Sequence, residues 1–590
     1  MAPQATSQRR PPRGAVRVSL ACAPCRSKHL RCDAMTPICS RCNSEGKDCV
    51  YPRSRRGGRR RPSSPQLPTK EAISPEHQTH VVHIADLQLG QDTQLISPDQ
   101  EQNTSDSATG ASVNSDTSSD SSMADRLLPH YYSFFHAAHP CVLPQWAMRR
   151  YMVNNSGQLH FLTSVMQYIG SVYAQSVPSA VCKEIAERAL SSLGIVTGFD
   201  VQALLLYSIA TYWQNEPKRS LDLLDKAISM ALKLGMNKQA FASHNGKGDP
   251  VLEESWRRTW WQIYATDAHI AGSTHTYPFR TSNIEMDVDL PCEEDEYETG
   301  NIPRPRTLHE YDMREFASDD SPEFSSFAEL AGLTRSLDLA LVSRQGLGLA
   351  NSHAMCANLD ASVTAWRSLL SPSKKEIARV DGSFDEILFK ANMVIHTYVV
   401  EVHRQLSALE YSPIEAVAHC APPPPTAIRG FNAQERQLHT SKALRAIEQF
   451  EDLLTLPTNI ATHTPFLICM IANIVIAHLS ACRFVFQGQQ LKLARERIRL
   501  SMGTLKVLGE HWPMGRRTYQ EVGIIARDML GFKEKIPQAQ VVEIQPEIPL
   551  TGVGFDPISL PLDSVQMGLD LSAFDANINF CGLFDQAVCD

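Results

Sequence analysis

The sequence predicts two folded parts of different kinds: a small cysteine-rich module near the N-terminus and a large all-α domain, joined by a disordered linker. Three observations predict this organisation. Six of the 15 cysteines lie between residues 22 and 49, residues 63–123 are rich in Ser, Thr and Asp, and apolar residues recur at helical spacing over residues 124–535. A chain of 590 residues with 43% hydrophobic content is too long for one domain and can build a sizeable core.

Charge is distributed unevenly along the chain. The net charge is −8, yet residues 1–62 carry 13 Arg and 2 Lys against three acidic residues, while residues 536–590 carry eight acidic residues and no basic one. A basic N-terminal segment on an otherwise acidic chain indicates a polyanionic partner at that end alone. No apolar segment precedes Arg9-Arg10, so we expect no secretory signal and an intracellular protein.

The N-terminal cysteines repeat one spacing twice. They read C-x2-C-x6-C-x6-C-x2-C-x6-C and are Cys22, Cys25, Cys32, Cys39, Cys42 and Cys49. In a reducing compartment this cluster favours metal over disulfides. A structural zinc takes four ligands, so six thiolates serve two zincs only if two of them are shared, whereas an iron–sulfur cluster, the alternative, needs four. We therefore expect two structural Zn²⁺, bridged by the first cysteine of each half, Cys22 and Cys39.

Basic residues lie between the second and third of these cysteines, namely Arg26, Lys28 and Arg31. With the cysteine spacing, this pattern resembles the fungal Zn2Cys6 binuclear-cluster transcription factors, and Pro37 and Tyr51-Pro52 fit the same family. The resemblance implies a short basic helix that enters the major groove of DNA and reads a CGG-like triplet.

Within that helix, Lys28 and His29 occupy the positions that contact bases in the family. His29 stands where Lys or Arg is commoner, so it brings less charge to the triplet. A Lys or Arg side chain can donate to guanine O6 and N7, and other basic groups neutralise phosphates.

A run of arginines follows the last cysteine, consisting of Arg53, Arg55, Arg56, Arg59, Arg60 and Arg61. Its position directly after the metal module favours contact with the DNA backbone together with a nuclear-import role. The alternatives are an import signal alone or a solvated charged face.

The segment between the two folded parts lacks the composition of a core. Between residues 104 and 122, 11 of 19 residues are Ser or Thr, and none is aromatic. Such a segment buries too little apolar surface to offset its ordering entropy, so we expect disorder over residues 63–123, as over residues 1–16.

The following region shows the periodicity of helices. Apolar residues at three-to-four spacing mark residues 201–212 and 221–234, with a turn between them and Gly235 as a C-cap, so these two helices should pack antiparallel. We expect more helices at residues 444–456, 500–512 and 522–530, and loops at residues 301–325 and 422–425. The apolar run at residues 466–481 is shorter than the ~20 residues of a membrane span, which predicts a buried helix and no membrane contact.

A second family resemblance covers part of this region. Glu254-Ser255-Trp256-Arg257-Arg258-Thr259-Trp260-Trp261, with Tyr264, Asp267 and Leu290-Pro291 after it and Gln202-Ala203-Leu204-Leu205 before it, resembles the fungal-specific transcription factor domain, or middle homology region. The resemblance implies a regulatory, all-helical domain. The two tryptophans spaced four apart, Trp256 and Trp260, favour core packing over a ligand site.

Enzymatic functions find no support in the motifs. The chain has no phosphate-binding glycine loop, no dinucleotide fingerprint, no nucleophile elbow and no HExxH zinc motif, and two zincs saturated by six thiolates leave no open catalytic position. The remaining cysteines are expected to be ordinary buried or free thiols; they are Cys141, Cys182, Cys292, Cys356, Cys420, Cys469, Cys482, Cys581 and Cys589.

Together these features predict a nuclear, sequence-specific DNA-binding regulator of RNA polymerase II transcription, in which zinc is structural. The family resemblance suggests that it controls a metabolic pathway or a secondary-metabolite gene cluster. The alternative is a ligand-sensing helical regulator in which DNA binding is secondary. We expect five segments: residues 1–16, disordered; 17–62, the Zn2Cys6 DNA-binding domain with its basic tail; 63–123, the linker; 124–535, the helical domain; and 536–590, an acidic tail.

The acidic tail alternates acidic and bulky apolar residues, which is typical of an activation segment that binds a coactivator. A solvated tail, or one that docks on the helical domain, is the alternative. No sustained heptads are present in the linker, so the protein is expected to bind DNA as a monomer or to form a homodimer through the helical domain.

Overall fold

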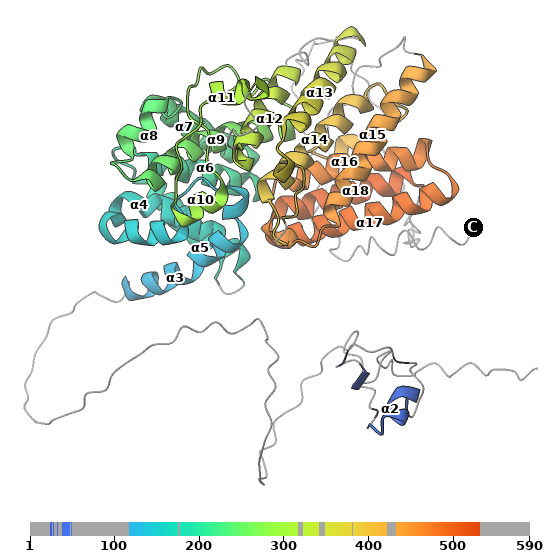
Figure 1. Cartoon of the computed structure of the whole chain (residues 1–590), viewed down its shortest axis with the longest axis horizontal. Coiled ribbons are helices and arrows are strands. Elements are labelled where there is room, and N and C mark those ends of the chain that lie inside the picture. Colours follow the sequence, from blue (N-terminus) through green and yellow to red (C-terminus); the bar gives the residue numbers. More distant parts are fainter. Residues whose placement is uncertain are drawn as a thin grey trace, which may run out of the picture. The chain divides into compact units, whose positions relative to one another are not determined.

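The computed structural model describes residues 24, 25, 28, 32, 38–47 and 49 near the N-terminus, and residues 117–174, 177–316, 323–341, 349–379, 382–421 and 432–531 beyond it. Contacts divide the chain into two units, residues 1–109 and residues 110–590. The first unit contains helix α2 (Ser40–Ser44), drawn in dark blue in Figure 1. The expected disordered segment at residues 1–16, most of the expected linker and the acidic tail lie outside the described residues.

The regular secondary structure among the described residues of the second unit is helical, apart from isolated β-bridges at Leu290–Arg306 and Ala378–Phe384. In chain order its α-helices are α3 (Thr117–Phe134), α4 (Gln145–Tyr173), α5 (Ser179–Ser191), α6 (Gly198–Trp213), α7 (Pro217–Leu234), α8 (Gln239–Asn245), α9 (Pro250–Thr274), α10 (Glu294–Thr299), α11 (Leu308–Asp312), α12 (Ser326–Leu341), α13 (Leu349–Leu369), α14 (Glu386–Arg404), α15 (Ala433–Leu454), α16 (Leu467–Phe484), α17 (Gly488–His511) and α18 (Pro513–Met529). The short 3₁₀ helices are η1 (His136–Ala138), η2 (Arg314–Phe316), η4 (Pro372–Lys374), η5 (Pro413–Val417) and η6 (Ile460–Thr462). The prediction of a large all-α domain is confirmed.

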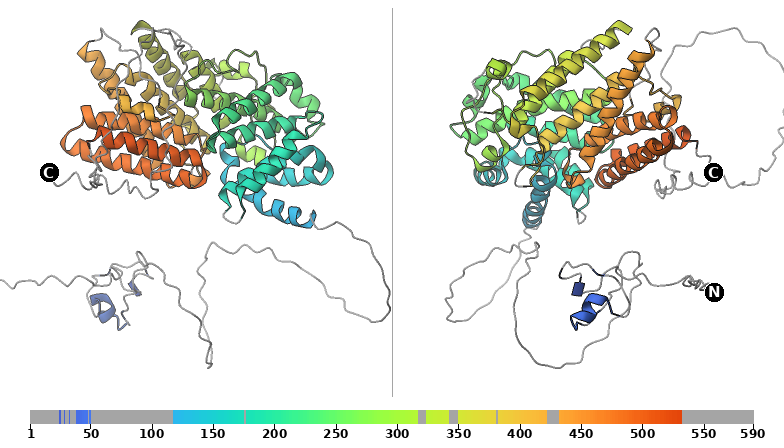
Figure 2. Two further views of the ribbon diagram at one scale, coloured as in Figure 1. Left: turned by 180° about the vertical axis from the view of Figure 1, so that it is seen from behind. Right: turned by 45° about the vertical axis from the view of Figure 1, so that its right-hand side comes forward.

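The helices form two groups around one continuous apolar core. In Figure 1, helices α3 to α11, coloured blue to green, lie beside helices α12 to α18, coloured yellow to red. Helix α9 contacts α6, α7, α8 and α12, so it links the two groups. Figure 2 shows α17 and α18 side by side in both of its views, and both pack against α16.

The expected antiparallel pair is present as α6 and α7. The backbone N–H of Thr197 donates to the Asp200 carboxylate over 2.8 Å at the start of α6, which satisfies an otherwise free donor. Gly235 ends α7 with a φ of 79°, a left-handed conformation that glycine adopts without strain. Ser220 donates from its hydroxyl to the carbonyl of Ser208 over 2.7 Å and joins the two helices.

The apolar run at residues 466–481 forms the core helix α16. This helix is long and apolar enough to cross a membrane, but 83% of its residues are buried inside the domain. The helices expected near residues 444–456, 500–512 and 522–530 fall within α15, α17 and α18.

Three expectations need correction. The region at residues 301–325 is not a simple loop, because α11 and η2 form within it. Helix α3 begins at Thr117, inside the segment expected to be linker. Cys420 and Cys469 are not free thiols but form a disulfide. The loop expected at residues 422–425 lies outside the described residues.

Candidate metal centre and nucleic-acid interface

The start of α2 places the fourth cysteine of the motif at the centre of the module. Cys39 is the N-cap of α2, and its sulfur accepts a hydrogen bond from the backbone N–H of Cys42 over 3.4 Å. The backbone N–H of Cys39 in turn donates to the sulfur of Cys49 over 3.3 Å. Such N–H···S contacts favour the thiolate form, which is the form that binds metal.

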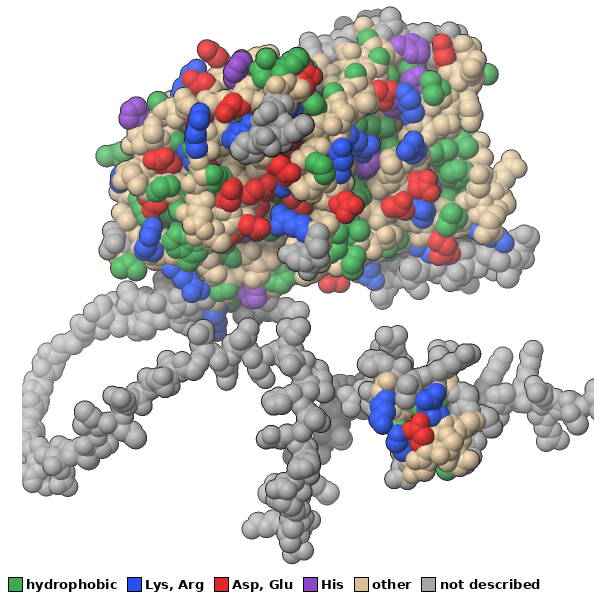
Figure 3. Space-filling model, in the orientation of Figure 1, with side chains coloured by type: hydrophobic (Ala, Val, Ile, Leu, Met, Phe, Trp, Pro, Cys, Tyr) green, Lys and Arg blue, Asp and Glu red, His purple; other side chains and the backbone are tan. Residues whose placement is uncertain are grey.

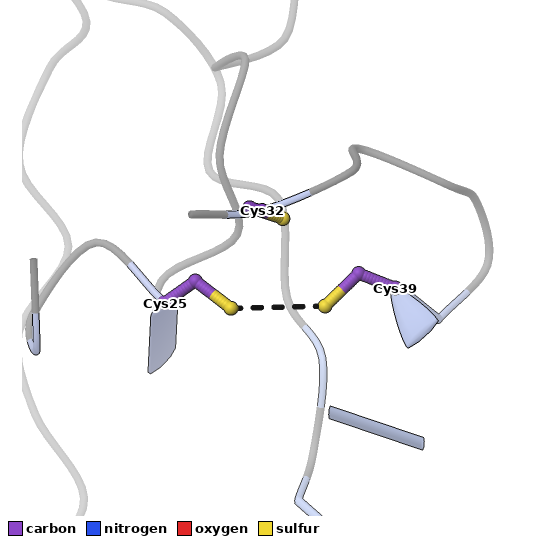
Figure 4. A group of neighbouring side chains, drawn as sticks. All are labelled: Cys25, Cys32 and Cys39. Atoms are coloured by element: carbon purple, nitrogen blue, oxygen red, sulfur yellow. Dashed lines mark hydrogen bonds between the residues drawn. The ribbon is translucent and has the colours of Figure 1, made fainter. Parts of the chain in front are cut away.

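The described cysteines form two groups that share one member. Cys25, Cys32 and Cys39 place their sulfurs within 4.8 Å of one another, and so do Cys39, Cys42 and Cys49. Figure 4 shows the first group, with the sulfurs of Cys25 and Cys39 facing each other 3.7 Å apart. Two thiolates on a tetrahedral zinc, with Zn–S bonds of about 2.3 Å, lie about 3.8 Å apart. The spacing therefore fits two ligands on one metal.

Burial and oxidation state agree with metal ligation. Cys25, Cys39 and Cys42 are at most 2% exposed, and all five described cysteines of the motif are free of disulfides. These cysteines form the buried cluster of the module, so the module has no larger apolar core among its described residues. A segment of this size depends on metal for its fold.

The described basic residues of the module lie near one carboxylate, that of Glu45. Lys47 contacts Glu45 over 2.5 Å, and Arg41 lies 3.8 Å from the same side chain. A hydrogen bond with the nearby Lys47, together with charge repulsion, lowers the pKa of Lys28 from its ordinary value. Figure 3 shows Lys and Arg side chains beside acidic ones on the part of the module that the structure describes. Sequence reasoning missed Arg41 and Lys47, although both lie within the cysteine repeat.

The two halves of the repeat differ in charge. Lys28 stands three residues after Cys25, and Glu45 stands three residues after Cys42, so a base in the first half corresponds to an acid in the second. The same comparison pairs Arg31 with Asp48. Because DNA attracts cations, the first half is the better candidate for contact with it.

The structure describes only some of the expected site residues. Lys28 is exposed, and five of the six expected zinc ligands fall into the two groups above. The other expected site residues lie outside the described residues; they are Cys22, Arg26, His29, Arg31, Arg53, Arg55, Arg56, Arg59, Arg60 and Arg61.

The motif of the large domain forms a buried charge network on α9. The Glu254 carboxylate accepts from Nε of Arg257 and from Nε of Arg258, each over 2.8 Å. Arg258 also donates to Glu294 on α10 over 2.7 Å and to the carbonyl of Cys292 over 2.8 Å. The network therefore fastens α9 to the segment that leads into α10.

The remaining motif residues complete the same core. Trp256 and Trp260 are 4% and 0% exposed, which confirms core packing. Asp267 accepts from the backbone N–H and the hydroxyl of Thr281, over 2.7 and 3.0 Å. Gln202 on α6 donates to the hydroxyls of Ser255 and Thr259 on α9. These contacts hold helices α6 and α9 and the segment after α9 together.

Comparison with known proteins agrees with both units. Residues 20–58 match the family described as the fungal Zn(2)-Cys(6) binuclear cluster domain, and residues 196–359 match the fungal specific transcription factor domain. The C6 finger domain transcription factor iacK of Pestalotiopsis fici is 29% identical over 591 aligned residues, which cover 91% of this chain and 84% of that protein. No solved structure matches the chain. A binuclear cluster of this kind holds two Zn²⁺ through six cysteines.

Proposed function

We propose that this chain, a DNA-binding transcription factor with a Zn(2)-Cys(6) binuclear cluster and a fungal specific transcription factor domain, reads CGG-like triplets at RNA polymerase II promoters. It is not an enzyme. Its zinc ions stabilise the fold of the DNA-binding module, residues 17–62. It binds promoters in the nucleus. Residues 124–535 form the regulatory domain.

The observation that carries the proposal is the membership of Cys39 in both cysteine groups. A residue shared by two metal sites is a bridge, and Cys22, the equivalent residue of the first half, is the second bridge. Cys25 and Cys32 then complete one zinc, and Cys42 and Cys49 complete the other. Each metal reaches the four ligands of a closed structural site.

The DNA contacts divide into base readout and backbone positioning. Lys28 and His29 contact the triplet in the major groove, where a basic side chain donates to guanine. Arg26 and Arg31 flank them in the sequence between Cys25 and Cys32. The arginine run from Arg53 to Arg61 follows the phosphates, which adds affinity without sequence information. The exposed position of Lys28 and the charge difference between the two halves support this assignment.

Two matched variants test the division. Lys28→Ala should cost about 1–3 kcal/mol at one guanine position and relax discrimination there. The triple variant of Arg59, Arg60 and Arg61 to Ala should weaken binding to all sequences alike and lower the slope of log K against log salt by about 0.9 for each phosphate that is no longer neutralised. Fluorescence anisotropy with specific and scrambled duplexes measures both. Equal effects of both variants on the two duplexes would contradict the division.

We infer further that the targets are genes of a metabolic pathway, such as a secondary-metabolite gene cluster, and that residues 536–590 recruit a coactivator. Genome-wide occupancy combined with binding-site selection in vitro tests the first inference. Occupancy confined to genes of unrelated cellular functions would contradict it. The length of the protected footprint separates a monomer on one half-site from a homodimer formed through the helical domain.

A second candidate function is ligand sensing by the helical domain. The observation that favours it is a cavity between three of its helices. Helices α15, α16 and α17 line a cavity of about 510 Å³, within the range of small-molecule sites. Glu451 is fully buried at this cavity, and its Oε2 has no hydrogen-bond partner, while Oε1 contacts His478 over 2.7 Å. The lining mixes apolar side chains such as Leu444 and Leu493 with charged ones, and Arg497 lies 3.8 Å from Oε2 of Glu451. A buried acceptor in such a setting suits a ligand with a polar hydrogen-bond donor.

Native mass spectrometry of the full chain purified from its own host tests this function. A small molecule released on denaturation and absent from an Ala494→Phe variant, which fills the hollow, would support it. A Leu339→Phe variant changes an exposed side chain on α12 and serves as control. Chain that carries no small molecule would contradict ligand sensing at this place.

A further inference from the structure

Three metal-ligating side chains converge in the large domain, far from the N-terminal cysteines in sequence. Cys356 comes from α13, His403 from α14 and His439 from α15. They are 3%, 0% and 6% exposed, and their ligand atoms all lie within 4.8 Å of one another. Neither the transcription-factor function nor the family motifs use these residues.

The imidazoles of His403 and His439 approach each other through their Nδ1 atoms. Nδ1 of His403 lies 2.7 Å from Nδ1 of His439. Two nitrogens on a tetrahedral zinc, with Zn–N bonds of about 2.0–2.1 Å, lie about 3.3 Å apart. If the two nitrogens move apart by about 0.6 Å, they can therefore both bind one metal, with Cys356 as the third ligand.

A carboxylate orients the central histidine. Nε2 of His403 lies 3.1 Å from Oδ1 of Asp360, and Lys442 contacts the other oxygen of that carboxylate. When Nε2–H donates to Asp360, the lone pair of His403 is on Nδ1, which faces the other two ligands. A metal-bound histidine commonly donates its second ring N–H to a carboxylate in this way.

We propose that Cys356, His403 and His439 bind a third Zn²⁺, which ties α13, α14 and α15 together. Thiolate and imidazole are ligands that zinc prefers. The Cys356 thiolate offsets part of the charge of the ion, and the Asp360 carboxylate, which Lys442 also contacts, offsets a further part. The fourth position is open to water or to His353, whose ring centre lies 5.8 Å from that of His439.

A second cysteine–histidine group among the described residues of the large domain does not offer the same chemistry. His419, Cys420 and Cys469 also lie within 4.8 Å of one another, but the two cysteines form a disulfide and so provide no thiolate. Cys356 has no disulfide partner.

The experiment measures zinc per chain in the full-length protein, after dialysis against metal-free buffer, by elemental mass spectrometry. We expect three zincs in the natural protein and two in His439→Gln and Cys356→Ser. Cys482→Ser, which replaces another buried free cysteine, should keep three. Two zincs in the natural protein, or three in both ligand variants, would overturn the proposal. A third ion that is copper instead of zinc would also overturn it.

A second measurement does not depend on the folding of the ligand variants. A full chain in which the six N-terminal cysteines are Ser retains the proposed site alone, and titration with Co²⁺ should saturate at one ion per chain with thiolate-to-cobalt absorption. Zinc should displace the cobalt and abolish that absorption. Absence of a thiolate band in this otherwise folded chain would refute ligation by Cys356.

Discussion

Cys39 should be the most sensitive of the six N-terminal cysteines to substitution. Its sulfur belongs to both ligand groups, whereas that of Cys49 belongs to one. Cys39→Ser therefore leaves both zincs with three thiolates, while Cys49→Ser leaves one zinc complete. Cys39 is also 0% exposed, so the hydroxyl that replaces its sulfur cannot gain contact with water.

The size of the effect follows from the role of zinc in folding. Binding of a structural zinc contributes about 10–16 kcal/mol near neutral pH, which is the folding free energy of such a module. A module without either complete site should fall to the affinity of non-specific DNA binding, which is weaker by about 10³-fold or more. Cys49→Ser should keep one tightly held zinc and an intermediate affinity.

Zinc release to a chromophoric chelator and anisotropy on a specific duplex measure the two quantities on the same samples. Ser44→Ala is the matched control, because it changes an exposed hydroxyl on α2 that contacts only the carbonyl of Arg41 among the described residues. The bridging assignment fails if Cys39→Ser retains one tightly held zinc, or if Cys49→Ser releases both zincs as readily as Cys39→Ser.

Three further predictions concern the rest of the chain. Glu254→Gln should lower the free energy of unfolding by about 3–5 kcal/mol in urea titrations, because it removes the buried carboxylate that Arg257 and Arg258 share and leaves Arg258 with Glu294 alone. The exposed Glu448→Gln should cost less than about 1 kcal/mol. Burial lowers the pKa of His396 to about 3, so the unfolded chain binds a proton that the folded chain does not, and stability is lost as the pH falls below about 6.5. His396→Leu should flatten that loss by up to about 1.4 kcal/mol per pH unit, and an unchanged slope would contradict the assignment. Residues 536–590 fused to an unrelated DNA-binding domain should activate a reporter, and the fusion should become silent when four apolar residues become Ala, namely Phe574, Phe580, Leu583 and Phe584.

Sequence patterns predicted those parts of the structure whose stabilising interactions lie between residues close together in the sequence. The repeated cysteine spacing predicts the metal module because zinc ligation needs particular residues at short separations. The helix pair of α6 and α7 follows from three-to-four periodicity with a glycine that takes a positive φ. The burial of α16 follows from its composition and length.

Features that depend on distant partners could not be predicted. Helix α11 forms in a proline-rich region because Thr307 and Glu310 cap it and because Tyr311 donates to the buried Glu329 on α12. The disulfide joins cysteines 49 residues apart. The group of Cys356, His403 and His439 comes from three helices and has no local spacing that would identify it. In the proposed DNA interface, Lys28 is a prediction from the motif, whereas its proximity to Lys47 depends on the fold of the repeat.

The charge difference between the two halves of the module explains how a symmetric metal site can serve an asymmetric task. Both halves supply the same ligand spacing, so the zinc cluster alone gives no preferred face toward DNA. Glu45 and Asp48 place acids on the second half where the first half has Lys28 and Arg31, and phosphates repel them. Residues 63–535 add a net charge of −12, which likewise disfavours contact with DNA. In the second half these acids offset the charges of Arg41 and Lys47, so net attraction is strongest at the first half and the arginine run. Glu45→Lys should therefore raise affinity for all sequences without improving discrimination between them.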